Sequence, residues 1–193
     1  MTAMTKKELR EIFRTKRKAI TVAEKLKLDD LLLIQFQNLS FKQLRCLFSY
    51  FPKENYKEPN TLLFSRYLSH FVEDLKIAYP VVNSELKTMN AVLIDDSTEF
   101  VTGNFGILEP VGGKIILPES IDLVFIPLLC FDKKGYRVGF GGGYYDKYLI
   151  RCRKDALKIG FSYFEPVESI DDKALFDVPL DFCITPEKIY EFK

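Results

Sequence analysis

The chain has 193 residues, of which 47% are hydrophobic and 28% charged, and its formal net charge is +1. This composition is typical of a soluble globular protein, and the length suits one domain, 1–193, with a sizeable core. A near-neutral charge excludes the broad basic field that drives nonspecific nucleic-acid binding, so we expect no nucleic-acid partner. The apolar runs are far shorter than the ~20 residues needed to span a membrane, so we expect no membrane partner.

The four cysteines are scattered and form no C-x-x-C pair, and only one histidine, His70, is present to support a zinc site. A single histidine also disfavours Ser/His or Cys/His catalysis. Cys46, Cys130 and Cys183 lie in apolar, strand-like runs, where a buried thiol behaves as a small hydrophobic group. Together with the lack of a signal-peptide pattern, this cysteine usage favours a reducing, cytoplasmic location.

An amphipathic helix is predicted over residues 5–19, because its apolar residues recur at helical spacing, namely Leu9, Ile12 and Phe13. Basic residues crowd the rest of this helix. Lys6 and Arg10 lie one turn apart and could converge on a phosphate. The alternative interpretation is an ordinary solvated face.

Further elements follow in chain order. Thr21 and Glu24 form a capping box that starts a second helix, ending near Leu39. A third helix is predicted over 61–71, and residues 100–110, broken by two glycines and a proline, are expected to form a loop. Apolar runs predict strands over 44–51, 75–82, 89–94, 121–129, 157–163 and 181–185. Alternating strands and helices indicate an α/β fold with a mostly parallel central sheet and helices on both faces, and ligands bind such sheets at the carboxyl ends of strands.

The stretch 132–149 contains five of the ten glycines. An apolar run precedes it and a helix-compatible segment, 146–153, follows it, so the order is strand, glycine loop, helix. Such a loop presents backbone N–H groups to an anion, above all a phosphate. Arg137 adds a fixed positive charge and Asp146 could hold a metal ion. Ordinary turns and tight packing are the competing explanation for the glycines.

Generic nucleotide motifs do not explain this stretch. Gly143 is followed by Tyr144, so both the P-loop Gly-Lys-Ser/Thr and the sixth-position glycine of the Rossmann fingerprint are missing. The actual pattern, Phe131-Asp-x-x-Gly-x-Arg137-x-Gly139-x-Gly141-x-Gly143-Tyr144-Tyr145-Asp146, closely resembles the signature of the 5-formyltetrahydrofolate cyclo-ligase (methenyltetrahydrofolate synthetase) family. The resemblance extends over nearly the whole chain, through segments 6–10, 58–61, 105–110 and 179–187.

The resemblance implies an ATP- and Mg²⁺-dependent conversion of 5-formyltetrahydrofolate to 5,10-methenyltetrahydrofolate. The formyl oxygen would be phosphorylated, and N10 would then close the ring as phosphate leaves. Such chemistry depends mainly on positioning and charge neutralisation and needs no histidine or cysteine. The partners implied are therefore small molecules, bound by what we expect to be a monomer.

The same resemblance assigns roles to individual residues. Arg137 would be catalytic, and Asp146 and Asp181 would hold Mg²⁺ directly or through water. ATP would be bound by Lys6, Lys7, Arg10, Arg137, Gly139, Phe140, Gly141, Gly142, Gly143, Tyr144 and Tyr145. The folate substrate would be bound by Phe48, Glu58, Phe140, Gly141, Gly142, Gly143 and Tyr144, with Glu58 accepting hydrogen bonds from the pterin.

Two other functions stay open at this point. A nucleotide- or RNA-binding regulatory protein could keep the fold without the catalysis, and the basic helix over 5–19 motivates that alternative. The near-neutral charge and the presence of Arg137, Asp146 and Asp181 argue against it. A third candidate is an ATP-using enzyme that acts on a different small formyl or amide substrate.

Overall fold

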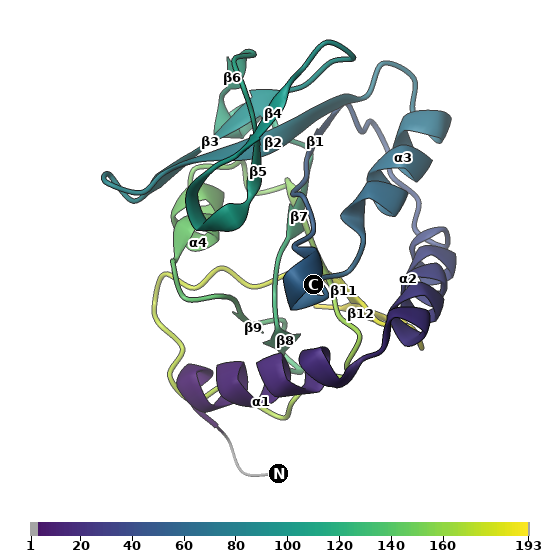
Figure 1. Cartoon of the computed structure of the whole chain (residues 1–193), viewed down its shortest axis with the longest axis vertical. Coiled ribbons are helices and arrows are strands. Elements are labelled where there is room, and N and C mark those ends of the chain that lie inside the picture. The colour runs from purple at the N-terminus through teal and green to yellow at the C-terminus, as the bar shows by residue number, and fades with distance from the viewer. Residues whose placement is uncertain (1–3, 193) are drawn as a thin grey trace.

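One eight-stranded sheet organises the protein, seen here in a computed structural model that describes residues 4–192 (Figure 1). Its strand order is β12-β11-β10-β7-β1-β2-β3-β6, and β4-β5 and β8-β9 form two small separate hairpins. The strands are β1 Cys46–Phe48, β2 Lys76–Asn83, β3 Thr88–Leu93, β4 Phe100–Thr102, β5 Leu108–Pro110, β6 Ile115–Ile116, β7 Leu123–Ile126, β8 Cys130–Phe131, β9 Arg137–Val138, β10 Leu157–Phe161, β11 Phe182–Ile184 and β12 Ile189–Glu191. The helices are α1 Lys6–Ala19, α2 Val22–Phe36, α3 Thr61–Phe71 and α4 Tyr144–Leu149.

The middle of the sheet is parallel, as the sequence predicts. Strands β11, β10, β7, β1 and β2 pair side by side in the same direction. Every residue of β7 is buried, which fits a central strand covered on both faces. The outer strands β12, β3 and β6 are antiparallel. For β3 the reason is local, because the short turn 84–87 cannot make the crossover that a parallel neighbour needs.

The helices begin where the sequence places their caps. Thr5 and Glu8 form a capping box at the start of α1, and the predicted box of Thr21 and Glu24 starts α2. Helix α3 has its predicted bounds, whereas α2 ends at Phe36, before Leu39. Within residues 4–192, no helix has the length and apolar character required to cross a membrane.

Helices cover both faces of the sheet, which confirms the predicted architecture (Figure 1). On one face, α2 and α3 pack a cluster that includes Leu32, Phe36, Phe64, Leu47 and Phe125. On the other, α4 packs a second cluster that includes Tyr148, Leu149, Phe48, Val124 and Ile126. Helix α1 crosses one end of the molecule and buries Leu9 and Phe13 against Leu129, Cys130, Val138 and Ile170.

Several short elements differ from the sequence prediction. Segment 100–110 is not only a loop, because β4 and β5 pair there as an antiparallel hairpin. The strand predicted over 181–185 is not the last, since β12 follows it. The strand predicted over 121–129 is shorter in the structure, where β7 covers only Leu123–Ile126. The hairpin β8-β9 then separates β7 from the glycine loop. These pairs are two or three residues long, too short for a periodic pattern to reveal.

Candidate active site

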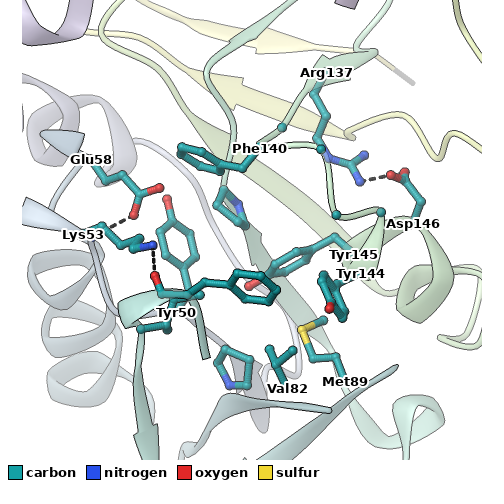
Figure 2. A pocket seen from close by; sticks show the side chains of 18 of the residues that line it. Tyr50, Lys53, Glu58, Val82, Met89, Arg137, Phe140, Tyr144, Tyr145 and Asp146 are labelled. Atoms are coloured by element: carbon teal, nitrogen blue, oxygen red, sulfur yellow. Dashed lines mark hydrogen bonds and ion pairs between the residues drawn. The ribbon is translucent and has the colours of Figure 1, made fainter. Parts of the chain in front are cut away.

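A cavity of about 570 Å³ opens beside the carboxyl ends of β1 and β7 (Figure 2). One face of α1 forms a wall, through Lys6, Arg10 and Arg14. The loop after β1, the segment 139–146 and the tip of the β4-β5 hairpin supply the other walls. The pocket therefore lies where ligands bind parallel sheets, as the sequence predicts.

The glycine loop lines this cavity along its whole length, from Gly139 to Gly143. Gly141 and Gly143 have φ of +108° and +68°, conformations that glycine adopts without strain. Gly143 caps α4, and the Arg10 Nε donates a hydrogen bond of 3.0 Å to the Gly139 carbonyl. The glycine loop and α1 thus form one continuous surface, although they are far apart in sequence.

Arg137 is buried at one end of the pocket and makes two directed contacts. Its Nη2 lies 2.7 Å from Asp146 Oδ1, and its Nη1 donates to the carbonyl of Val178. The same Asp146 oxygen accepts the Val178 amide at 3.1 Å. Arg137 and Asp146, predicted as separate ATP and metal contacts, are therefore direct partners in this structure. A guanidinium fixed in this way offers a rigid positive surface to a phosphate.

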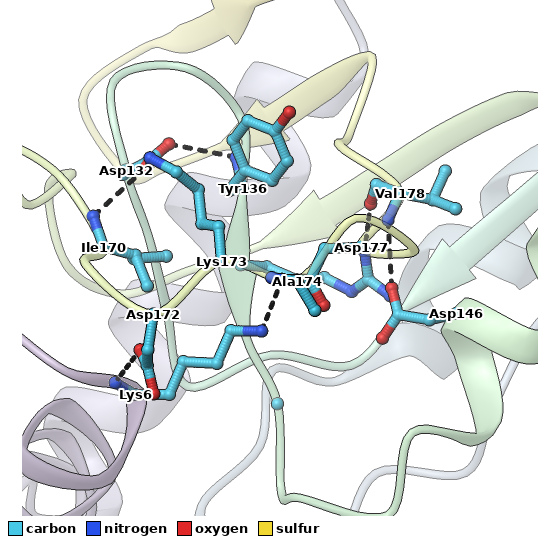
Figure 3. A network of polar contacts seen from close by, with 12 residues as sticks. Lys6, Asp132, Tyr136, Asp146, Ile170, Asp172, Lys173, Ala174, Asp177 and Val178 are labelled. Atoms are coloured by element: carbon cyan, nitrogen blue, oxygen red, sulfur yellow. Dashed lines mark hydrogen bonds and ion pairs between the residues drawn. The ribbon is translucent and has the colours of Figure 1, made fainter.

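Lys6 forms the second ion pair of this end, with Asp177 (Figure 3). Its backbone N–H also donates to Asp172 at 2.6 Å. Asp177 accepts the Ala174 amide at 2.8 Å, so the carboxylate is held by its own loop. We call Lys6, Arg10 and Arg137 the cationic end of the pocket.

The segment 170–178 attaches this end to the glycine stretch. Asp132, fully buried, accepts the backbone amides of Lys134 and Tyr136 at 2.9 and 3.0 Å. Its other oxygen accepts the Ile170 amide at 3.3 Å and lies 3.4 Å from the Lys173 ammonium (Figure 3). Asp132 therefore joins the β8-β9 turn to the segment that supplies Asp177.

Glu58 lies at the opposite end of the pocket, which we call the acidic end (Figure 2). Its side chain is buried, and the Lys53 amide donates a 2.7 Å hydrogen bond to its Oε2. Burial raises the pKa of the Glu58 carboxyl above its usual range. A buried acceptor beside a cavity suits a ligand that carries two or more N–H donors.

Aromatic side chains fill the space between the two ends. Figure 2 shows Phe140, Tyr144 and Tyr145 between the Glu58 side and the Arg137–Asp146 pair, with Tyr50 beside Glu58. Tyr144 meets Phe105 of the β4-β5 hairpin edge-on, with ring centroids 5.9 Å apart. Aromatic walls favour a flat heteroaromatic ligand.

Three predicted site residues lie elsewhere. Phe48 is fully buried in the core, stacked behind Tyr145 at 6.2 Å between ring centroids, and does not line the pocket. Lys7 is exposed on α1, away from the pocket wall. Asp181 is also outside the lining, where its Oδ2 accepts the Lys158 amide and lies 2.8 Å from the Lys158 ammonium. The structure therefore brings together all the predicted contacts except these three.

Other lining residues were missed by sequence reasoning. Arg14 continues the row of Lys6 and Arg10 by one more helical turn, so helical spacing alone could have found it. Tyr50 lies near the carboxyl end of the strand predicted over 44–51, the usual place for a ligand contact in a parallel sheet. No local sequence pattern pointed to Asp177, because its ion-pair partner, Lys6, is distant in sequence.

Metal binding can be considered from the carboxylates. Within residues 4–192, no three His, Cys, Asp or Glu side chains gather into a metal site. Mg²⁺ commonly uses one or two protein carboxylates together with substrate phosphates and water. Asp146 fits that role, because it lines the pocket and its hydrogen bonds with Arg137 and Val178 use Oδ1. Asp181 fits less well, being outside the lining and engaged by Lys158.

The fold and the pocket define an α/β protein with a small-molecule site, cationic at one end and acidic at the other. A model of the 5-formyltetrahydrofolate cyclo-ligase family matches residues 2–186, so the chain belongs to that family. This confirms the resemblance found in the sequence and makes the protein an enzyme of the cyclo-ligase class.

Individual relatives agree with the family match. A 5-formyltetrahydrofolate cyclo-ligase of Mycoplasma pneumoniae is 31% identical over 194 residues, covering 95% of this chain and 100% of the relative. Another, from Mycoplasma genitalium, is 46% identical over 69 residues, but that match covers only 35% of this chain and 42% of the relative. The solution structure of Aquifex aeolicus 5,10-methenyltetrahydrofolate synthetase superposes with a TM-score of 0.81 at 28% identity, covering 97% of this chain and 93% of that one.

Proposed function

We propose that this protein converts 5-formyltetrahydrofolate to 5,10-methenyltetrahydrofolate, using ATP and releasing ADP and phosphate. The observation that carries the proposal is a single pocket with a cationic glycine loop at one end and a buried carboxylate, Glu58, at the other. Family membership implies ATP as co-substrate. The pocket offers separate regions for a triphosphate and for a pterin.

The cationic end supports binding of the triphosphate. Lys6, Arg10 and Arg137 converge on the glycine loop, whose backbone can approach phosphate oxygens closely. Lys6 and Arg137 are already oriented by Asp177 and Asp146. Such preorganised charge stabilises a phosphoryl group in transfer without reorganisation at the moment of reaction.

The acidic end supports binding of the pterin. The amino group and ring N–H of a pterin are donors, and Glu58 provides the acceptor beside Tyr50. With the pterin there, the formyl oxygen would face the terminal phosphate across the aromatic middle of the pocket. The oxygen attacks that phosphorus and ADP leaves. N10 then attacks the activated carbon and loses its proton to solvent, and phosphate leaves with the former formyl oxygen.

Asp146 is the residue that would hold Mg²⁺ near the triphosphate, and Asp181 stays a weaker prediction. A bound Mg²⁺ would neutralise phosphate charge. Arg137 and Asp146 would stay adjacent when the ion is bound. Arg137 would then orient the phosphates, and Asp146 would hold the cation. Asp146→Asn is expected to raise the Mg²⁺ concentration required for half-maximal rate.

The test is an absorbance assay with 5-formyltetrahydrofolate, ATP and Mg²⁺, following the near-ultraviolet band of methenyltetrahydrofolate. We expect the band to grow only when all three are present, with one ADP released for each product formed. A folded protein that binds ATP yet never produces the band would overturn the proposal and favour another formyl or amide substrate.

We also infer that the enzyme works as a monomer in the cytoplasm. All four cysteines lie in the described part of the chain and are free thiols, as expected in a reducing compartment. Sedimentation at micromolar protein should give a mass near 22.4 kDa. A mass of twice that value would contradict the monomer.

A further inference from the structure

Arg17, in the last turn of α1, has no role in the function proposed above, yet it is almost completely buried, with 1% of its surface exposed. Its Nη2 donates to the carbonyl of Leu128, next to Pro127 in the pocket wall. Within residues 4–192, its Nε and Nη1 have no hydrogen-bond partner. A buried charge with one neutral partner and no carboxylate contact is costly, so its retention calls for a compensating charge nearby.

Glu58 is the buried carboxylate on the segment that packs against this end of α1, because the ammonium of the adjacent Lys57 donates to the carbonyls of Lys18, at 2.8 Å, and Ile20. Within the described residues, neither Glu58 nor Arg17 belongs to any direct ion pair. Burial lowers the pKa of Arg17, and the negative charge of Glu58 is the foremost influence opposing that effect. Burial raises the pKa of Glu58, and the Lys53 amide and then the Arg17 charge oppose it. Tyr50, in the pocket wall, interacts with both charges.

Other groups also face Glu58, and they come from four segments of the chain. Two are cationic and three are tyrosines with buried hydroxyls. They are Lys25 of α2, Lys53 of the loop after β1, Tyr50 after β1, Tyr145 of α4, and Tyr163 after β10. Lys25 is committed to an ion pair of 2.7 Å with Asp29, and Lys53 reaches the Phe105 carbonyl. Among the cations facing Glu58, Arg17 is the one buried behind the pocket wall and free of a carboxylate contact in the described chain.

We propose that Arg17 is a positioning residue, whose buried positive charge keeps the Glu58 carboxylate ionised so that it can accept the donors of the pterin. This inference rests on the proposed function for its substrate, but not for its electrostatics. Arg17 lies behind the wall, out of the lining, so it acts on the substrate only through Glu58. In a low-dielectric interior, opposite charges interact over distances at which water would screen them.

Two neutral variants separate this role from simple packing. Arg17→Gln removes the charge but keeps an amide donor. Arg17→Met removes both. Lys18→Gln is the matched control, because it removes an exposed cation from the adjacent position on the same helix. If the charge of Arg17 matters, both neutral variants should show the effect. If Arg17 only anchors the helix through its hydrogen bond, Arg17→Met alone should show it.

The direct readout is the titration of Glu58 itself, followed by NMR in protein labelled with ¹³C at glutamate carboxyl carbons and assigned with Glu58→Gln. Removing the Arg17 charge should move the Glu58 midpoint upward, on the order of one pH unit. Lys18→Gln should leave the midpoint in place. An unchanged midpoint in folded Arg17→Gln would overturn the proposal, whatever the enzyme assay shows.

The kinetic readout is the pH profile of kcat/KM for 5-formyltetrahydrofolate. In both neutral variants the acid limb should shift upward, with a loss that approaches about tenfold on the acid side of the midpoint and recovers as the pH is raised. KM for ATP should not change, because the cationic end is untouched. A pH-independent loss in Arg17→Met alone would make Arg17 structural.

Failure of this inference is distinguishable from failure of the proposed function. If wild-type protein forms no methenyltetrahydrofolate but the Glu58 midpoint still depends on Arg17, the proposed substrate is wrong and the electrostatic coupling stands. If the wild type is active and the midpoint ignores Arg17, the function stands and the positioning role is lost.

Discussion

At the cationic end of the pocket, Lys6 and Arg137 each form an ion pair with a carboxylate, whereas at the acidic end Glu58 and Arg17 are buried without a direct ion pair in the described chain. Ion-paired cations are oriented in advance, and an incoming phosphate must share them with Asp177 and Asp146. The Glu58 carboxylate is different, because one backbone amide is its direct partner and no cation forms an ion pair with it in the described chain. The first end is therefore built for positioning and the second for discrimination between donors and non-donors.

The largest effect is expected at the cationic end. Arg137→Ala should lower kcat/KM for ATP by about 10²–10³-fold, the usual loss when one preorganised charge-stabilising donor is removed. The melting temperature should fall far less in proportion. Steady-state kinetics and thermal unfolding measure the two quantities, with exposed Arg66→Ala as the control. An active Arg137→Ala that merely unfolds earlier would make Arg137 structural.

At the acidic end, Glu58→Gln should raise KM for 5-formyltetrahydrofolate by about 10–100-fold, since a charge-assisted hydrogen bond is lost. KM for ATP should stay within twofold, on the order of measurement error in such comparisons. Equal losses for both substrates would remove the division of the pocket into two ends.

The same variant tests the burial of the charge. Because burial raises the pKa of Glu58 in the folded state, the native protein binds more protons than the unfolded chain between the two pKa values. Stability is therefore lost as the pH rises through that window. Glu58→Gln lacks this titration, so its melting temperature should exceed that of the wild type increasingly from acid to neutral pH. Parallel curves would show that the carboxylate is solvated.

A smaller, paired effect concerns α1. Arg10→Ala should weaken ATP binding by about tenfold, as for loss of one hydrogen bond to a charged group. Lys7→Ala should change it by less than about twofold, as for an exposed surface charge. Isothermal titration with ATP compares the two variants directly. A larger effect at Lys7 would show that the helix turns another face to the nucleotide.

The smallest effect has the opposite sign. Asp177→Asn removes the carboxylate that competes with phosphate for Lys6, so ATP should bind a few-fold more tightly. Asp171→Asn, an exposed neighbour, serves as the control. Weaker binding in Asp177→Asn would mean that orientation of Lys6 matters more than competition for its charge.

Much of the fold was predictable because its signals are local. The capping box of Thr21 and Glu24 and the apolar spacing of α1 specify helices within a single turn or two. The antiparallel pairing of β3 with β2 could also have been predicted, because the turn between them is too short for a parallel crossover. The hairpins β4-β5 and β8-β9 were not, because two- and three-residue strands are defined by their partners and not by their own sequence.

The site divides in the same way. Its glycine loop and Arg137 stand out in the sequence, and family resemblance added Glu58. The ion pairs of Lys6 with Asp177 and Arg137 with Asp146 depend on how the segment 170–178 folds back, which no local pattern reveals. Phe48 illustrates the opposite case. It belongs to β1, whose three residues are all buried, and the ring of Tyr145 stacks on it, so it does not reach the pocket.

The two edges of the eight-stranded sheet have a consequence for how the enzyme behaves in a crowded solution. The outermost strands are β6, with two residues, and β12, with three. An edge strand recruits another chain through its row of unpaired N–H and C=O groups, and edges this short offer few of them. A second copy of the chain would therefore find few backbone groups on β6 or β12 with which to pair a strand.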